Sequence, residues 1–432
     1  FPQTATFSSD IDLAGSIDVD GTTNLDVVDI DGAVDMASTL QVDGAITGSS
    51  TINGVGINVI ETESILVSND GGTGTISSAL RNTGFGYEVF DDLTTGDDNT
   101  SIGRRALTKV TTGSSNVAVG SGTIELNTTG SNNTGLGYLA LYANTTASNN
   151  TAVGLSALAA NTTGGSNTSL GASALAANTT GSSNVAVGVT TLDANTTGAD
   201  NVAMGNGALG ANTTADDNVA IGHEALTTNT TGIRNTAISS FSLDANSTGE
   251  NNTAVGYASL SANTTASNNT GLGYFALAAN TTGAFNVSLG AFTLDANTTA
   301  SHNTGIGYNS LSANTTGTRN VALGSLALDA NTTANDNTAI GYEALGANTT
   351  GDLNTAVGQG ALTANTTGAS NDAFGGNSLD ANTTGSFNVA LGRSALSANT
   401  TANSNTAVGH AALAANTTGA NNTALGFAAL DA

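Results

Sequence analysis

The sequence predicts an all-β fold, a β-solenoid or β-roll of 21 coils with seventeen residues each. An Asn recurs every seventeen residues from Asn82 to Asn422, with no insertion or deletion, so each unit fills one fixed structural pitch. Asn, Thr and Gly dominate the units, and these residues are poor helix formers that suit turns and stacked β-coils. Phrases such as "VAVG" and "TAIG" add the period-two alternation of a strand.

The first part of the chain has a different pattern, in which Asp-Gly or Asn-Gly pairs separate short apolar runs. Such pairs are the strongest short signal for a hairpin or turn. They are Asp20-Gly21, Asp31-Gly32, Asp43-Gly44 and Asn53-Gly54. We therefore expect a β-rich shaft segment at residues 1–59 and a junction at 60–81. The repeat region then covers 82–432, and we expect it to continue beyond Ala432.

The repeat unit is numbered here in slots, with the recurring Asn as slot 1. Slot 4 is apolar in all 21 units and slot 9 is Leu in 19 of them, while slots 3, 8 and 11 are mostly small. Slots 2 and 4 should face one way and slot 3 the other. We predict slots 4 and 9 as the core. The predicted core residues include Val119, Val153, Leu158, Val187, Leu192, Val255, Leu260, Leu272, Leu277, Leu323 and Leu328.

The polar slots predict turns and ladders. Slot 5 is Gly in every unit but one, where Ser239 stands, which indicates a turn with positive φ or a close backbone approach. Slots 12 to 14 read Asn-Thr-Thr from Asn127 to Asn416, once as Asn246-Ser247-Thr248, and Asn at slots 1 and 12 can pass amide hydrogen bonds from coil to coil. We expect two short strands and two turns per coil. The predicted turn and ladder residues include Asn116, Gly120, Asn133, Asn252, Gly256 and Asn263.

The apolar content of each coil is small, so a single thin rod would be marginally stable. Several chains wrapped together would bury more apolar area per residue. We therefore expect a homotrimeric rod.

Composition excludes several functional classes. The 33 Asp and Glu outnumber 7 Lys and Arg, giving a net charge of −26, and a polyanion of this kind should bind neither nucleic acid nor an anionic lipid surface. The absence of Cys removes disulfides, thiol catalysis and Cys-ligated zinc. No apolar run approaches the roughly 20 residues of a membrane helix, so we expect no membrane insertion by this chain.

The segment around slot 1 resembles the head repeats of trimeric autotransporter adhesins, which carry an Asn-Ser-Val-Ala-Ile-Gly type of motif on a left-handed β-roll. The matching segments include Ser115-Asn116-Val117-Ala118-Val119-Gly120, Asp217-Asn218-Val219-Ala220-Ile221-Gly222 and Arg319-Asn320-Val321-Ala322-Leu323-Gly324. The match covers about six residues per unit across 82–432, although those heads usually have shorter units. Residues 1–80 are similar in composition to shaft segments of bacteriophage tail fibres.

These resemblances imply a non-enzymatic fibre: a rigid trimeric rod, on a phage tail or a bacterial surface, that presents a receptor-binding tip. The receptor would be a host or cell-surface molecule, such as a glycan, and the location would be extracellular. The alternatives are a self-assembling extracellular filament or surface-layer component, and an ice- or carbohydrate-binding solenoid. Nothing breaks the repeat to form a cleft of unlike groups, so we expect no enzyme.

No cofactor or metal site is expected from the remaining chemistry-bearing residues. His223, His302 and His410 lie in different units, and acidic pairs such as Asp216-Asp217 fit solvated turns better than a catalytic acid and base. Residues 10–21 have an Asp spacing that is the one candidate for calcium.

Two repeated surface positions keep alternatives open. Asn-Thr-Thr matches the N-glycosylation pattern, although an unmodified Asn ladder explains it as well. Slot 6 holds six of the seven Tyr, which either pack between chains or form an exposed stripe that stacks on sugars. They are Tyr87, Tyr138, Tyr257, Tyr274, Tyr308 and Tyr342.

Overall fold

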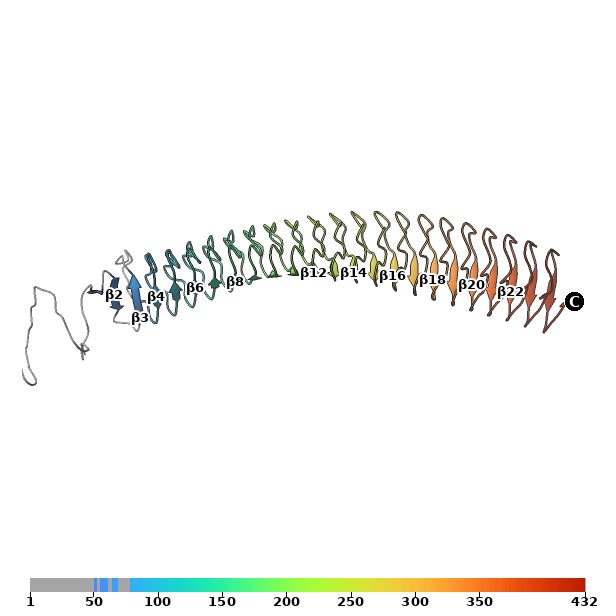
Figure 1. The fold of residues 1–432 in the computed structure, drawn as a ribbon, viewed down its shortest axis with the longest axis horizontal. Helices are drawn as coiled ribbons and strands as arrows, with labels where there is room; N and C mark the ends of the chain where they lie inside the picture. Colours follow the sequence, from blue (N-terminus) through green and yellow to red (C-terminus); the bar gives the residue numbers. More distant parts are fainter. Residues whose placement is uncertain (1–49, 53–54, 61–63, 69–77, 432) are drawn as a thin grey trace, which may run out of the picture. The chain divides into compact units, whose positions relative to one another are not determined.

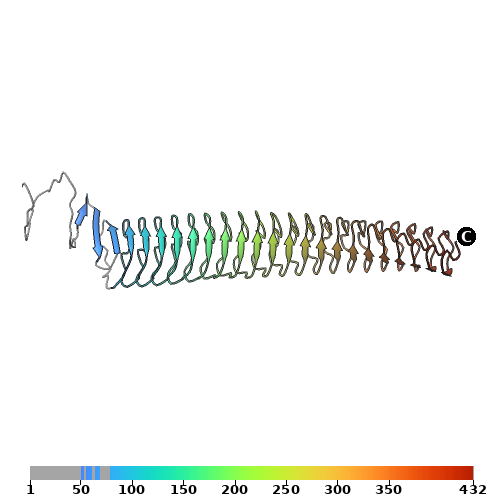
Figure 2. The same ribbon diagram turned by 90° about the horizontal axis from the view of Figure 1, so that it is seen from below.

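The computed structural model describes residues 50–52, 55–60, 64–68 and 78–431. The repeat region forms a parallel β-solenoid of about 21 turns, and no helix occurs among these residues. Figures 1 and 2 show the coils stacked in one continuous row from β4 to β24. The Asp-Gly turns and most of the predicted shaft segment lie outside the described residues.

The coils are preceded by three strands that change the pairing direction. β1 (Ser50–Ile52) pairs antiparallel with β2 (Val55–Ile60), and β2 pairs antiparallel with β3 (Ser64–Ser68). β3 then pairs in parallel with β4 (Thr83–Phe85), which is the first strand of the repeat region. The solenoid therefore starts from an antiparallel strand pair within the unit Gly48–Ala432.

Each coil contributes one strand of three residues from slots 2 to 4, and every strand pairs in parallel and in register with the strand seventeen residues away. After β4, the strands are β5 (Thr100–Ile102), β6 (Val117–Val119), β7 (Thr134–Leu136), β8 (Thr151–Val153), β9 (Thr168–Leu170), β10 (Val185–Val187), β11 (Val202–Met204), β12 (Val219–Ile221), β13 (Thr236–Ile238), β14 (Thr253–Val255), β15 (Thr270–Leu272), β16 (Val287–Leu289), β17 (Thr304–Ile306), β18 (Val321–Leu323), β19 (Thr338–Ile340), β20 (Thr355–Val357), β21 (Asp372–Phe374), β22 (Val389–Leu391), β23 (Thr406–Val408) and β24 (Thr423–Leu425).

The prediction of two strands per coil is wrong. Slots 5, 7 and 9 have positive φ, as in Gly256, Ala258 and Leu260 with φ of 131°, 51° and 54°, and a strand cannot continue through them. The turn segment is nevertheless bonded to its neighbour. The N–H of Leu260 donates to the carbonyl of Ala276 at 2.9 Å, and that of Ala262 donates to Ala278 at 3.0 Å.

The core of each coil is formed by slots 3, 8 and 9. The predicted core residues of slot 9 are confirmed, because their side chains are fully buried: Leu158, Leu192, Leu260, Leu277 and Leu328. Slot 3, an Ala, Gly or Ser, is the inward residue of each strand. The interior is so narrow that an added Cβ at Gly271 would lie 2.5 Å from the Ser259 hydroxyl, and one at Gly135 would lie 2.6 Å from Thr123.

The assignment of slot 4 to the core of the single chain is wrong. Slots 2 and 4 share the outer face of the sheet, so the slot 4 side chains point away from the interior that slot 3 fills. Leu272 is 41% and Leu323 is 43% exposed. The other predicted core residues of this slot are partly exposed: Val119, Val153, Val187 and Val255.

The buried Leu residues adopt a left-handed backbone, which is unusual for a residue with a branched side chain. Leu192, Leu260 and Leu328 have φ between 52° and 54°. This conformation costs about 1–2 kcal/mol per residue. Burial of a Leu side chain contributes about 1.5–3 kcal/mol, which offsets that cost, whereas a Gly would relieve the strain and leave the core empty.

Replacement of Leu260 by Ala tests the slot 9 core. We expect a loss of about 2–5 kcal/mol in the free energy of unfolding, because the side chain is fully buried and nothing can collapse into its place. Thermal and denaturant unfolding followed by circular dichroism measures the effect. Leu155→Ala is the control, since Leu155 is 55% exposed and its replacement should change stability little. Equal unfolding curves for the two variants would contradict this core assignment.

Candidate functional site

The most regular chemistry of the molecule is a ladder of slot 1 Asn side chains, buried from Asn82 to Asn405. The Oδ1 of Asn99 accepts from the main-chain N–H and from the Nδ2 of Asn116, both at 3.0 Å. Asn133 repeats these contacts on Asn116 at 3.0 and 3.1 Å. The amide thus satisfies a buried backbone N–H in the next coil, which explains why a polar side chain can be buried here.

A second ladder is formed by slot 12 and is joined to the first inside each coil. The Nδ2 of Asn144 donates to the Oδ1 of Asn127 at 2.9 Å. Gly130 in slot 15 accepts from the Nδ2 of Asn116 and from that of Asn127, each at 2.9 Å. In another coil, the carbonyl of Ala266 accepts from the Nδ2 of Asn252 at 2.8 Å and from that of Asn263 at 3.0 Å. The predicted ladders at Asn116, Asn133, Asn252 and Asn263 are therefore confirmed.

The Gly of slot 5 meets both conditions that were predicted for it. Gly120 and Gly256 have φ of 134° and 131°. An added Cβ at either position would lie about 2.4–2.5 Å from the carbonyl oxygen of the Gly one coil further on. Ser239 occupies this slot with φ of 108°, so the one exception keeps the unusual backbone. The prediction for these two glycines is confirmed.

Replacement of Asn269 by Ala tests the ladder. The N–H of Asn286 would lose its acceptor, the Oδ1 of Asn269 at 3.0 Å, and a buried donor without a partner costs about 1–3 kcal/mol. We expect a loss of that size in the free energy of unfolding, measured by denaturant titration. The control is Asn268→Ser, because Asn268 is exposed and Ser stands in the same slot at Ser115 and Ser183. Loss of stability in the control alone would contradict the role of the ladder.

The outer face of the sheet carries a row of partly exposed apolar side chains along the described coils. Slot 4 presents a Val, Ile, Leu, Met or Phe in every coil, and slot 2 adds Thr or Val beside it in every coil but one, where Asp372 stands. Exposed side chains of this face include Ile102, Leu136, Leu170, Met204, Leu289, Val321, Phe374 and Leu391, each between 38% and 48% exposed. A continuous apolar face of this extent marks an interaction surface.

Ion pairs join neighbouring coils at the edges of the solenoid. Arg81 contacts Asp98 and Arg319 contacts Asp336, each at 2.6 Å and one coil apart. Lys109 lies 3.1 Å from Asp92, and Arg234 lies 3.4 Å from Glu250. These pairs are exposed, so each contributes little to stability. The four pairs involve four of the seven Lys and Arg, and most of the 33 Asp and Glu have no cation to pair with, so the chain is strongly acidic.

The structure does not bring the three His residues together. His223 packs edge-on against Phe241, His302 stacks on Phe285, and His410 stacks on Phe427. No group of three His, Cys, Asp or Glu side chains is placed to hold a metal ion within the described ranges. The calcium candidate at residues 10–21 lies outside them. Across the described residues, no helix has the length and apolarity to cross a membrane.

The Asn-Thr-Thr corners present one Thr row to protein and one to solvent. The slot 13 hydroxyl donates to the slot 13 carbonyl of the next coil, as Thr162 does to Thr179 at 3.0 Å. Slot 14 is exposed in every coil in which it is described, as at Thr163 and Thr180. The Asn of slot 12 is buried from Asn127 to Asn399, which places its amide away from any modifying enzyme in the folded chain.

Slot 10 holds carboxylates in a partly buried position that the sequence pattern did not reveal. Burial raises the pKa of Asp193, Asp244, Asp295, Asp329 and Asp380, and nearby backbone N–H groups oppose the shift. By contrast, hydrogen bonds from Arg319 lower the pKa of Asp336. Because burial disfavours the charged form, the slot 10 carboxylates oppose folding at neutral pH.

The slot 10 carboxylates predict a pH dependence of stability. An acid whose folded pKa is raised takes up a proton more readily in the folded state, so stability rises as pH falls through the raised pKa and stops rising below the ordinary one. The effect lies above the ordinary Asp pKa of about 3.9. We expect the double variant Asp329→Asn, Asp380→Asn to show a smaller rise in melting temperature between pH 7 and pH 4 than the unmodified chain.

The control for this experiment is Asp336→Asn. The pKa of Asp336 is lowered, so its contribution to stability is lost as pH falls, and its replacement should not diminish the rise between pH 7 and pH 4. Equal dependence in the double variant and the unmodified chain would overturn the role given to slot 10.

Aromatic side chains gather in one part of the solenoid. We call this set the aromatic row: His223, Phe241, Tyr257, Tyr274, Phe275, Phe292 and Tyr308. Four of these positions are slot 6, three of them Tyr, as the sequence showed. The three Phe lie in slot 7, for which the sequence pattern led to no prediction. The signal that could have found them is the concentration of aromatics at slots 6 and 7 of six consecutive units.

The fold and these surfaces define the class of the molecule, a parallel β-solenoid repeat protein. No known family model matches the chain, and a search of curated proteins finds no match. The functional argument therefore depends on the surfaces of the solenoid.

Proposed function

We propose that this chain is a non-enzymatic structural and adhesive fibre, a rigid homotrimeric rod that spaces and presents a receptor-binding tip outside the cell. One observation carries the proposal: the slot 4 position of the outer face is apolar in all 21 coils, and a single charged residue, Asp372, stands beside it in slot 2. On a solvated monomer such a face would promote aggregation, so the proposal assigns it to contacts between copies of the chain.

The repeated pitch supports the mechanical part of the proposal. Each coil adds one strand spacing of about 4.8 Å, so 21 coils give roughly 100 Å of length. Ladders that continue from coil to coil resist bending at any one position, because every coil is bonded to both neighbours. Length and stiffness are the properties that a spacer requires, and a receptor-binding tip would supply the specificity.

The slot 4 face fits contact with other copies because every coil offers the same apolar position. A side chain such as Leu323, 43% exposed in the single chain, would gain burial in a contact with another copy. In-register repeats let every coil of one chain meet an equivalent coil of its partner. Three thin chains would together enclose a second apolar core, in addition to the narrow one inside each coil.

Sedimentation velocity with light scattering on the full chain tests the proposal. We expect a stable particle of three times 42.0 kDa. The double variant Leu272→Asp, Leu323→Asp should dissociate it, because each charge would be buried between chains without a partner. Thr282→Asp with Thr333→Asp is the matched control, in the same two coils and of the same charge, at exposed positions.

Three results would change the conclusion. A monomer for the unmodified chain would overturn the trimer. Open-ended polymers would favour the self-assembling filament or surface-layer component. Dissociation of the control as readily as the Leu variant would show that the slot 4 face is not the contact.

A further inference from the structure

The aromatic row forms a continuous set of ring contacts across six consecutive coils. Tyr257 stacks on Tyr274 with ring centres 5.7 Å apart, and Phe275 stacks on Phe292 at 6.1 Å. Tyr274 meets Phe275 edge-on at 4.6 Å and Phe292 at 5.3 Å, which joins the two stacks. Phe292 then contacts Tyr308 at 6.2 Å.

The repeat itself does not require these rings. Slot 6 accepts Leu155, Val189 and Arg393 in other coils, and slot 7 accepts Ser156, Thr190 and Ser394 there. The rings do not fill the core either, since Tyr257, Tyr274 and Tyr308 are 42%, 49% and 54% exposed. The aromatic row is therefore an addition to the scaffold, confined to one part of its length.

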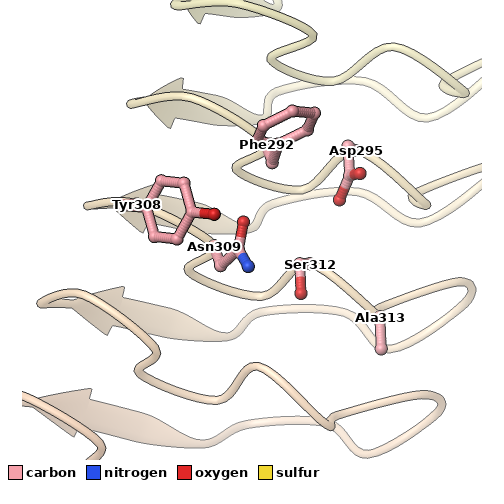
Figure 3. Close-up of a pocket in the computed structure, with 6 residues that line it drawn as sticks. All are labelled: Phe292, Asp295, Tyr308, Asn309, Ser312 and Ala313. Atoms are coloured by element: carbon pink, nitrogen blue, oxygen red, sulfur yellow. The ribbon is translucent and has the colours of Figure 1, made fainter.

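A groove runs beside the aromatic row toward slots 10 and 11. Two hollows of about 410 and 360 Å³ share Phe292 and Asp295 as walls. The first is also lined by Ser261, Phe275, Ala278 and Ala279, and the second by Tyr308, Asn309, Ser312 and Ala313. Figure 3 shows Phe292 and Asp295 from one coil beside Tyr308, Asn309 and Ser312 from the next. Small residues thus leave space opposite the rings.

The polar groups of the groove are those that recognise hydroxyls. Asp295 lines both hollows and places a carboxylate at their shared wall, where its Oδ1 is buried and lacks a hydrogen-bond partner among the described residues. Asn309 adds an amide and Ser312 adds a hydroxyl. Neither hollow has a Lys or Arg in its lining, so the groove offers nothing to neutralise an anionic ligand.

We propose that this groove binds a neutral glycan chain laid along the solenoid. The C–H face of a sugar ring packs on exposed aromatic rings, and its hydroxyls require the acceptors and donors that Asp295, Asn309 and Ser312 supply. The coil spacing of about 4.8 Å is on the order of the advance per sugar in an extended polysaccharide, so successive sugars can meet successive coils. This lateral site is distinct from the tip of the proposed fibre and does not depend on it.

Affinity gel electrophoresis of the full chain tests the proposal. The gels contain dextran, laminarin, galactomannan or hydroxyethyl cellulose, with heparin as the anionic comparison. We expect retardation by at least one neutral polysaccharide and none by heparin. The double variant Tyr274→Ala, Tyr308→Ala should weaken this retardation about tenfold, because two stacking rings are lost. Asp295→Asn should weaken it with the shape of the groove unchanged.

Tyr138→Ala is the matched control, because Tyr138 stands in the same slot, is 54% exposed and lies outside the aromatic row. Its retardation should equal that of the unmodified chain. Retardation by none of the four neutral polysaccharides, or an equal loss in the control, would overturn the proposal. The oligomeric state of each variant is measured by sedimentation. If the unmodified chain binds no polysaccharide and Tyr274→Ala, Tyr308→Ala changes the oligomeric state, the aromatic row forms a contact between copies of the chain instead.

Discussion

The structure depends on one hydrogen-bonded arrangement, the pair of buried Asn ladders that meet at the slot 15 carbonyl. At Gly130 that carbonyl accepts from Asn116 and from Asn127, so each ladder is bonded both along the stack and across the coil. A ladder works only if the same residue returns at the same place in every coil. This requirement accounts for the fixed unit of seventeen residues, because one inserted residue would leave buried amides and backbone N–H groups without partners.

The arrangement also explains how a coil with so little apolar content holds together. Its interior contains one Leu and two small residues, as in Leu260, Ser259 and Ala254. Burial of these groups is modest, and part of it offsets the left-handed backbone of the Leu. The rest of the stability of the coil comes from hydrogen bonds that join its backbone to neighbouring coils, in the strand and in the turns. The Asn amides also bond to buried backbone groups that would otherwise bind water.

The sequence was sufficient to predict the solenoid, its coil number and the roles of slots 1, 5, 9 and 12, since the residue type in each of these slots suits one structural role. It was not sufficient to orient the strand. Alternation in "TAV" shows that Thr253 and Val255 share a face but not whether that face is inside, and hydrophobicity favoured Val255. The deciding fact is the width of the coil, which leaves room only for Ala254. The groove was hidden for a similar reason: Phe292 and Asp295 are separated by slots 8 and 9, and only the left-handed turns bring them to one wall.

The exposed ion pairs have a consequence for folding. The coils of this chain are nearly identical, so a coil can loop out while its neighbours pair with each other, and few native contacts are lost. The register in which the coils pair is therefore weakly specified. Such a slip would place Arg319 beside Leu353 instead of Asp336, and Arg81 beside Ser115 instead of Asp98. Each pair contributes little to the stability of the finished molecule. Where two pairing registers are otherwise almost equal in free energy, a small difference still favours one of them. The few ion pairs therefore favour the native register in a sequence that is otherwise nearly uniform.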